Sequence, residues 1–423
     1  MTGGGGYGYR MAVVVVFAFN LRLATSAVAP LLPIIREDTG ISASAGGLLL
    51  TLPFLCFGTV APVVTRVARR LGTERTLVVA LAVLVASIVL RSAPGGLGPL
   101  FCGTLLMGAA ITFGNILLPG IIKRDFPKRA GVMMGIYTTA ITAGAGLAAA
   151  VTVPLMLAAG WGWQQALAFW AVSAAVAFVL WVPLGGNPHS RGQSYTQHVG
   201  PSARLLYRDS VAWQVTLFFG LQSLVYTAAV SWIPSVLTAH GISVSNAGFL
   251  LAIVSVTGMV TTFTVPVAAM QRRSQGTLVI AAVALLAISL AGLLVAPAAG
   301  ALLWMLLFGL GQGATYGLGF SLILLRSIDS GHAVALSGMT QTFGYLLSAA
   351  GPIGLGVLHD ATGGWSWPLI VLLVLLAPLA IAGFGGARRG YVLGMLPTDP
   401  APISTLTELV PDILAEDPRL SGT

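Results

Sequence analysis

Gly40-Ile-Ser-Ala-Ser44-Ala-Gly-Gly47-Leu-Leu returns later in the chain as Gly241-Ile-Ser-Val-Ser245-Asn-Ala-Gly248-Phe-Leu. Two further matches follow in the same order and at nearly the same spacing. They are Thr112-Phe-Gly114 with Thr315-Tyr-Gly317, and Gly160-Trp-Gly-Trp163 with Gly364-Trp-Ser-Trp367. Three ordered matches at a nearly constant spacing indicate that the second half of the chain repeats the first.

The composition of the chain is that of a membrane protein. Of its 423 residues, 56% are hydrophobic and only 8% are charged, and the mean hydropathy is +0.92. A soluble protein carries roughly 25% charged residues, so this chain has too few polar side chains to cover a water-facing surface of its size. We therefore interpret the net charge of +9 as a signal of membrane orientation, and expect a lipid bilayer, not a nucleic acid, around the protein.

Apolar segments of membrane-spanning length recur along the chain. We expect six in the first half, at 11–35, 43–66, 74–93, 98–122, 130–158 and 164–184, and six in the second, at 211–237, 245–270, 276–296, 300–325, 333–358 and 365–386. The repeated motifs fall on the same side of the membrane, so a pseudo-two-fold axis along the membrane normal relates the halves as a parallel repeat. The predicted fold is an all-α membrane protein with twelve transmembrane helices in two six-helix bundles.

Basic residues indicate how the chain is oriented and divided. They gather in the even-numbered connections and after the last span, for example at Arg66, Arg69, Arg70, Arg75, Lys123, Arg124, Lys128, Arg129, Arg272, Arg273, Arg388 and Arg389. The positive-inside rule then places both termini in the cytoplasm, in a multi-pass protein of the plasma (inner) membrane. We expect a disordered N-terminus (1–10), an N-terminal bundle (11–184), a cytoplasmic linker (185–209), a C-terminal bundle (210–386) and a cytoplasmic tail (387–423).

Asn20 and Arg22 lie near the middle of the first span. A guanidinium cannot lose its proton to avoid the membrane, and a charge at the bilayer centre costs about 2.5–3.5 kcal/mol or more. All 12 acidic residues are expected in loops, at helix ends or in the tail, so no embedded carboxylate can neutralise Arg22. We expect Arg22 to bind a mobile anion; the alternative is that carbonyl groups and water neutralise a guanidinium that only orders the helix.

Other polar side chains are predicted at mid-span. Three glutamines precede a tyrosine by four residues, a spacing that places both side chains on one face of a helix. Such pairs could line a cavity, although an amide in a membrane often bonds only a neighbouring helix and a tyrosine often only packs. The candidate substrate-binding residues are Asn20, Arg22, Asn115, Tyr137, Thr138, Gln222, Tyr226, Gln312, Tyr316, Gln341 and Tyr345.

Several motifs resemble those of one transporter group. They are Asn20-Leu-Arg22, Pro30-Leu-Leu-Pro33, Gly40-Ile-Ser, Thr51-Leu-Pro-Phe-Leu-Cys-Phe-Gly58, Ala68-Arg-Arg-Leu-Gly72, Met133-Met-Gly-Ile-Tyr-Thr138, Phe219-Gly-Leu-Gln-Ser223 and Gly309-Leu-Gly-Gln-Gly-Ala-Thr315. Over nearly the whole membrane domain the chain resembles the cyanate permease and nitroimidazole transporter group of the major facilitator superfamily. The resemblance implies the major facilitator fold and a cavity lined by the first, fourth, seventh and tenth spans.

The loop after the second span departs from the superfamily pattern Gly-x-x-x-Asp-Arg-x-Gly-Arg-Arg. Aligned on Gly72, the chain keeps Arg70 and has Arg75 nearby, but Arg69 stands at the position of the acid. The resemblance implies a conformational role for Arg69, Arg70, Gly72 and Arg75, while the usual acid-based latch between helices is missing. Glu74 and Asp125 are the candidates for its replacement.

The sequence therefore favours a secondary active or facilitative transporter of a small anionic or polar organic solute, such as a cyanate- or nitrate-like anion or a carboxylate, by alternating access. Coupling of transport to a proton and exchange for a counter-anion are both compatible with the sequence. The alternative is an exporter of neutral compounds such as nitroimidazoles or other drugs. We expect no enzyme activity, because no phosphate-binding loop and no cluster of acids, histidines and nucleophiles lies at membrane depth. We also expect no cofactor, no metal site and a monomer.

Overall fold

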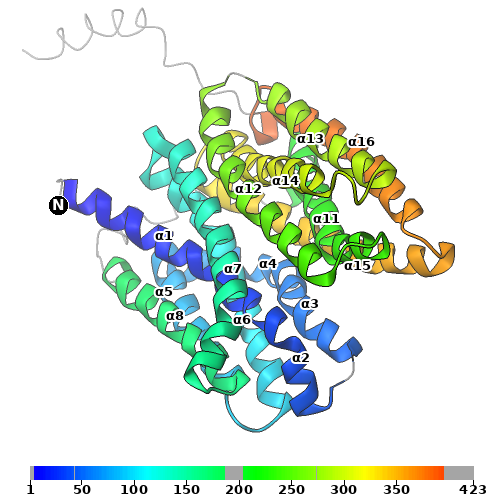
Figure 1. Ribbon diagram of the computed structural model, residues 1–423. Coiled ribbons are helices and arrows are strands. Elements are labelled where there is room, and N and C mark those ends of the chain that lie inside the picture. The colour runs from blue at the N-terminus through cyan, green and yellow to red at the C-terminus, as the bar shows by residue number, and fades with distance from the viewer. Residues whose placement is uncertain (1–3, 42, 186–202, 273, 395–423) are drawn as a thin grey trace, which may run out of the picture.

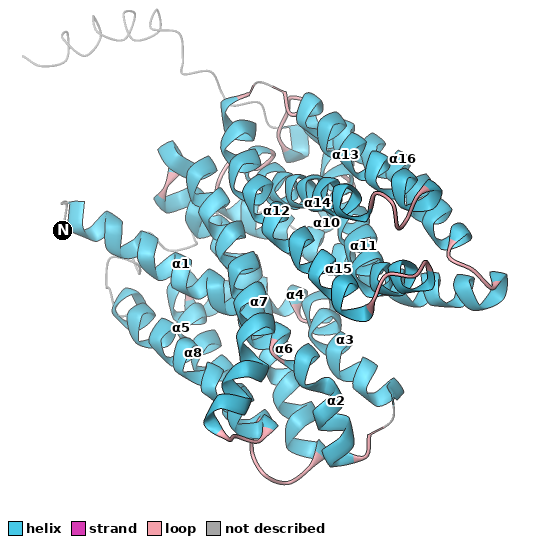
Figure 2. Cartoon of the chain, in the orientation of Figure 1, coloured by secondary structure: helices cyan, strands magenta, loops and turns pink. Residues whose placement is uncertain are grey.

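The computed structural model describes residues 4–41, 43–185, 203–272 and 274–394, in which every regular element is a helix (Figures 1 and 2). The N-terminal half contains α1 (Gly4–Ser26), α2 (Val28–Thr39), α3 (Ala43–Thr59), α4 (Ala61–Leu71), α5 (Thr73–Arg91), α6 (Leu97–Asp125), η1 (Pro127–Arg129), α7 (Ala130–Ala159) and α8 (Trp163–Gly185). The C-terminal half contains α10 (Ala203–Leu206), α11 (Ser210–Ala239), α12 (Val244–Gln271), α13 (Gly276–Val295), α14 (Ala301–Leu325), α15 (Ser330–Thr362), α16 (Ser366–Ala387) and η2 (Val392–Gly394).

The described helices have the length and surface expected in a bilayer. Ten of them are long and apolar enough to cross a membrane, or eleven if α3 and α4, which meet at a bend of 55°, form one span. The 33-residue helix α15 corresponds to the eleventh predicted span, but its polar and small residues keep it out of this group. Large apolar side chains are exposed on the outside, including Leu157 (70%), Phe249 (67%) and Ile381 (73%), as suits contact with lipid.

The packing of the helices repeats between the halves. In the N-terminal half α1 packs on α7 and α8, α5 on α6 and α8, and α3 on α6. In the C-terminal half α11 packs on α15 and α16, α13 on α14 and α16, and α12 on α14. Figure 1 shows the two groups side by side, one blue to teal and the other green to orange. The parallel repeat predicted from the sequence is thus present as one contact scheme used twice.

The halves meet on the side where the described chain begins and ends. Lys123 at the end of α6 donates from Nζ to the carbonyl oxygens of Leu324, at 2.7 Å, and Ser327. Gly120 lies so close to Val334 of α15 that a Cβ at position 120 would overlap the valine side chain. The terminus side is therefore closed.

The opposite side has no comparable junction among the described residues. There α2 packs on α1, α3, α7 and α8, which all belong to the N-terminal half. A separate hydrophobic cluster, which includes Leu31, Ile35, Met156 and Trp163, is also built only from that half. We conclude that these contacts join the halves on the terminus side, whereas on the other side the N-terminal half packs on its own helices.

The chain ends differ from the sequence-based expectation. The predicted disordered N-terminus is wrong for residues 4–10, because α1 begins at Gly4. The Tyr7 ring packs edge-on against Phe126 at 5.0 Å, and Arg10 pairs with Asp125 at 2.8 Å. These contacts hold a glycine-rich segment in a helix that its composition alone would not form.

The tail begins with an ordered segment. The Val392 amide donates to the carbonyl oxygen of Arg326 at 2.8 Å, and the Leu393 amide to Asp209 Oδ2 at 2.7 Å. Arg326 in turn donates to the carbonyl oxygens of Arg388, at 2.6 Å, and Gly390, at 3.1 Å. Residues 186–202 of the predicted linker (185–209) and the tail beyond residue 394 lie outside the described residues.

Candidate functional site

A pocket lies between the two halves, near the middle of the helices. Its empty volume is about 800 Å³, including the part that is open to solvent. Helices α1, α3 and α7 line it from the N-terminal half, and α11, α12, α14 and α15 from the C-terminal half. A molecule bound there would touch both halves at once.

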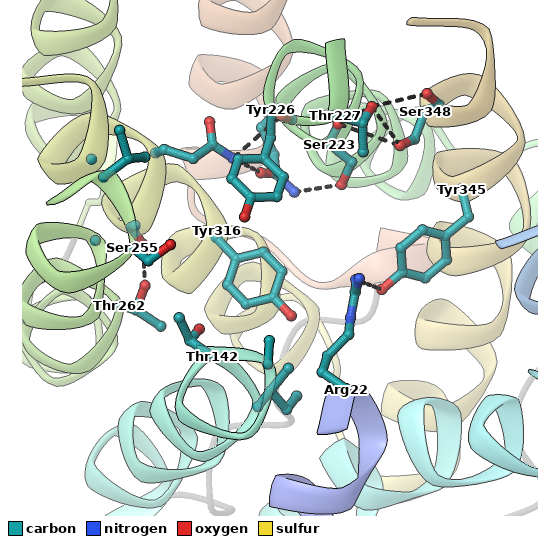
Figure 3. Close-up of a pocket in the computed structure, with 18 of the residues that line it drawn as sticks. Arg22, Thr142, Ser223, Tyr226, Thr227, Ser255, Thr262, Tyr316, Tyr345 and Ser348 are labelled. Carbon is teal, nitrogen blue, oxygen red and sulfur yellow. Dashed lines mark hydrogen bonds between the residues drawn. The ribbon is translucent and has the colours of Figure 1, made fainter. Parts of the chain in front are cut away.

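Arg22 reaches the pocket from α1 and lies among aromatic rings. Its guanidinium carbon is 5.3 Å from the ring centre of Phe54, 5.9 Å from Phe57 and 5.8 Å from Tyr345. Its Nη2 donates to the Tyr345 hydroxyl at 3.4 Å, as Figure 3 shows. Within the described part of the chain no ion pair includes Arg22. Among the described residues, aromatic faces and tyrosine hydroxyl groups rather than a carboxylate therefore offset its charge.

Gln222 of α11 and Gln312 of α14 form an amide pair in the wall of the C-terminal half. Gln312 Nε2 donates to Gln222 Oε1 at 2.9 Å, and Gln222 Nε2 donates to Ser223 Oγ at 2.7 Å. Tyr226 and Tyr316, each four residues further on, also line the pocket. Each amide and phenol thus share the pocket face of their helix, as their spacing predicts.

Small hydroxyl side chains, which the sequence did not single out, complete the polar wall. Thr227 of α11 donates to the carbonyl oxygen of Ser348 on α15 at 3.0 Å. Thr142 of α7 and Ser255 of α12 also line the pocket (Figure 3). Because Ser and Thr in membrane helices commonly bond the carbonyl four residues earlier, their occurrence at mid-span carries little signal in a sequence.

Three of the predicted amides lie outside the pocket lining. Asn20 turns toward α8, where Nδ2 donates to the carbonyl oxygens of Val16, at 2.9 Å, and Ser173, at 3.3 Å. Gln341 Nε2 donates to the backbone oxygen of Asn115 at 2.8 Å and so joins α15 to α6. In this conformation the side chains of Asn20 and Gln341 connect helices, which was the alternative for them. The third amide, Asn115, contributes its backbone oxygen, and its Nδ2 has no hydrogen-bond partner among the described residues.

The two predicted residues of α7 also lie outside the lining. Thr138 donates to the carbonyl oxygen of Thr262 at 3.0 Å, which links α7 to α12 across the halves. Tyr137 is fully buried, and its ring packs edge-on against Phe320 at 5.6 Å. Of the predicted residues the pocket thus brings together Arg22, Gln222, Tyr226, Gln312, Tyr316 and Tyr345.

The family model of the Major Facilitator Superfamily matches residues 14–352. The chain belongs to the major facilitator superfamily. Its relatives include the uncharacterized transporter YycB of Bacillus subtilis (strain 168), which is 37% identical over 90% of this chain and 93% of its own length. The 2-nitroimidazole transporter of Escherichia coli (strain K12) is 39% identical over 89% of this chain and 95% of its own length.

A more distant relative is the cyanate transport protein CynX of Escherichia coli (strain K12), which is 27% identical over 86% of this chain and 94% of its own length. Among solved structures, the proton:xylose symporter XylE is similar with a TM-score of 0.71 and 15% identity, over 89% of this chain and 94% of the symporter. These findings confirm the predicted resemblance and the all-α fold. The protein is a multi-pass integral membrane transporter of small solutes.

The loop between α4 and α5 of this major facilitator superfamily chain lacks the acid of the superfamily pattern, and the nearby acids form other ion pairs. Gly72 has φ of +83°, which favours glycine. Glu74 pairs with Arg124 at 2.7 Å, and Asp125 pairs with Arg124 at 2.6 Å and with Arg10. Arg69, Arg70 and Arg75 are exposed. Both acids thus pair within the N-terminal half, whereas Lys123 at the end of α6 bonds to the C-terminal half.

Proposed function

We propose that this chain moves a small anionic or strongly polar organic solute across the membrane by alternating access, and that Arg22 supplies the positive charge that binds it. The observation that carries the proposal is a guanidinium in the pocket between the halves with no carboxylate partner among the described residues. Because removing a cation from water without an anion is costly, an anion entering the pocket would gain more there than a neutral solute of the same size.

The remaining wall suits an organic anion. The rings of Phe54 and Tyr345 and the phenols of Tyr226 and Tyr316 supply flat apolar surface with hydroxyl groups at its edge. A planar carboxylate could place its charge at Arg22 and its body against these rings. Cyanate- and nitrate-like anions would use the Arg22 end alone.

We further propose that the protein works as a monomer in the plasma (inner) membrane with both termini in the cytoplasm. The basic connections support this orientation through the positive-inside rule. In that orientation the closed side, with Lys123 at its junction, faces the cytoplasm and the pocket opens outward. Release inward would then require the Lys123 contacts to break. Either a proton or a counter-anion would serve as the coupling species.

A second candidate is export of neutral nitroimidazoles. It is favoured by the relative named as a 2-nitroimidazole transporter, which matches 89% of this chain. A nitro group is a polar acceptor that could also accept from the Arg22 guanidinium, while the ring would stack on Phe54 or Tyr345. The two candidates therefore share a site and differ in the charge of the solute.

Ligand-dependent thermal stabilisation of the purified protein separates them, because specific binding stabilises the folded state by mass action. The panel contains cyanate, nitrate, a short carboxylate, benzoate and 2-nitroimidazole, each with the wild type, Arg22→Gln and the exposed-arginine control Arg36→Gln. Stabilisation by an anion that is lost only in Arg22→Gln supports the anion transporter. Stabilisation of the wild type by 2-nitroimidazole and by none of the anions favours the neutral exporter.

A further inference from the structure

Gln312 carries a buried side-chain oxygen that the described residues leave without a hydrogen-bond donor. Only 5% of the residue is exposed, it lines the pocket, and its Oε1 has no hydrogen-bond partner among the described residues. An amide oxygen removed from water without a donor costs free energy. A ligand that brings an N–H or O–H group to this oxygen would remove that cost.

The neighbouring bonds fix which end of the Gln312 amide is free. Its Nε2 lies 3.4 Å from the backbone oxygen of Gln222 and 2.9 Å from Gln222 Oε1. A backbone carbonyl can only accept, so the atom beside it must be the nitrogen of the amide. Gln222 Nε2 is in turn used by Ser223 Oγ at 2.7 Å. The chain of bonds therefore ends with an acceptor, the Gln312 oxygen.

Arg22 and Gln312 present opposite chemistry from the two halves of the protein. Arg22 lies on α1 of the N-terminal half and offers N–H donors and positive charge, whereas Gln312 lies on α14 of the C-terminal half and offers an acceptor. We infer that the preferred substrate carries an anionic or nitro group for Arg22 and, elsewhere in the molecule, an N–H or O–H donor that Gln312 Oε1 accepts.

This inference rests on the proposed function and narrows its substrate class. A hydroxylated aromatic carboxylate, or an azole with a free ring N–H and a nitro group, satisfies both ends of the site. Cyanate and nitrate satisfy only the Arg22 end and would leave the Gln312 oxygen unpaired. Gln312 is on this view a specificity-determining residue, because it selects among solutes that Arg22 alone would treat alike.

Matched ligand pairs that differ in one donor test the inference on the full-length protein. The first pair is 4-hydroxybenzoate and 4-fluorobenzoate, and the second is 2-nitroimidazole and 1-methyl-2-nitroimidazole. The affinity of each is measured by calorimetry for the wild type, Gln312→Leu and Gln341→Leu. Gln341 is the control because it is also a buried glutamine with an unpaired Oε1 but does not line the pocket.

We expect the wild type and Gln341→Leu to bind the donor-bearing member of at least one pair about tenfold more tightly, and Gln312→Leu to bind both members equally. Gln312→Met serves if Gln312→Leu does not fold. Equal binding of both members by the wild type, or a preference that persists in the Gln312 variants, overturns the inference. Arg22→Gln is measured in parallel: if binding is lost in that variant but does not depend on the donor, only this inference fails. If neither these ligands nor cyanate, nitrate or a short carboxylate binds the wild type, the proposed function fails with it.

Discussion

Lys123 of α6 donates from Nζ to the carbonyl oxygen of Leu324, 2.7 Å away in the last turn of α14. The bond crosses from the N-terminal to the C-terminal half, and the carbonyl of Ser327 is a second acceptor for the same ammonium group. Terminal carbonyls of a helix lack partners within the helix and carry partial negative charge. The lysine thus caps the end of α14 and helps to hold the terminus side closed.

Lys123→Ala should weaken this junction and favour the conformation in which the terminus side opens. Hydrogen bonds to charged groups contribute about 1.5–3 kcal/mol, so the ratio of the two conformations should change about tenfold or more. Spin labels at the C-terminal end of α6 and the N-terminal end of α15 would report a longer distance between these two helix ends in Lys123→Ala than in the wild type. The exposed Lys128 offers a control, and an equal change in Lys128→Ala would remove the special role of Lys123.

A cysteine at Ser255 tests the orientation and the open side together. Ser255 lines the pocket and is exposed, whereas Ser337 of α15 is fully buried. In a Cys56→Ala, Cys102→Ser background, we expect a membrane-impermeant thiol reagent applied to intact cells to label Ser255→Cys and not Ser337→Cys. Labelling of Ser255→Cys only in inverted vesicles would contradict the proposed outward opening.

Gly144 and Gly146 differ sharply in their surroundings although they are two residues apart on α7. A Cβ at Gly144 would overlap the carbonyl oxygen of Phe19 on α1, whereas a Cβ at Gly146 would meet nothing within 4 Å. Gly144→Ala should therefore lower the free energy of unfolding by about 1–3 kcal/mol, while Gly146→Ala should be neutral or slightly stabilising. Thermal unfolding in detergent measures both, and equal effects would refute the close α1–α7 contact.

The hydroxyl groups of Tyr137 and Tyr345 should have separable roles. Tyr137 is fully buried and its OH has no partner in the described structure, whereas the Tyr345 OH accepts from Arg22 at 3.4 Å and lines the pocket. Tyr137→Phe should leave stability unchanged or raise it, because removing an unpaired buried hydroxyl costs nothing. Tyr345→Phe should change ligand affinity with little effect on the melting temperature. The reverse pattern would argue that Tyr137 contacts substrate.

The internal repeat made most of the fold predictable, because two similar sets of apolar spans must pack by similar contacts. The features that were not predicted from the sequence depend on tertiary contacts. The glycine-rich start of α1 indicated disorder, but the contacts of Tyr7 and Arg10 keep it helical. The small hydroxyl residues, such as Thr142 and Ser255, became visible only once α7 and α12 were placed beside the pocket.

Helical geometry accounts for part of the pocket lining. Asn20 and Arg22 are two residues apart and so point to nearly opposite sides of α1, which explains why one faces α8 and the other the pocket. Gln341 and Tyr345 are four residues apart, but only Tyr345 lines the pocket. Gln341 Nε2 instead donates to the backbone oxygen of Asn115 on α6. Which neighbour lies beside a helix face cannot be derived from spacing alone.

Exchange in proteoliposomes measures directly whether Arg22 binds an anionic solute during transport. Vesicles that contain the wild type, Arg22→Gln or Arg36→Gln are loaded with the anion that stabilises the wild type most, and uptake of the labelled anion is followed. We expect saturable exchange in the wild type and Arg36→Gln, and no exchange above that of empty vesicles in folded Arg22→Gln. Exchange by Arg22→Gln at the wild-type rate and apparent affinity would contradict it.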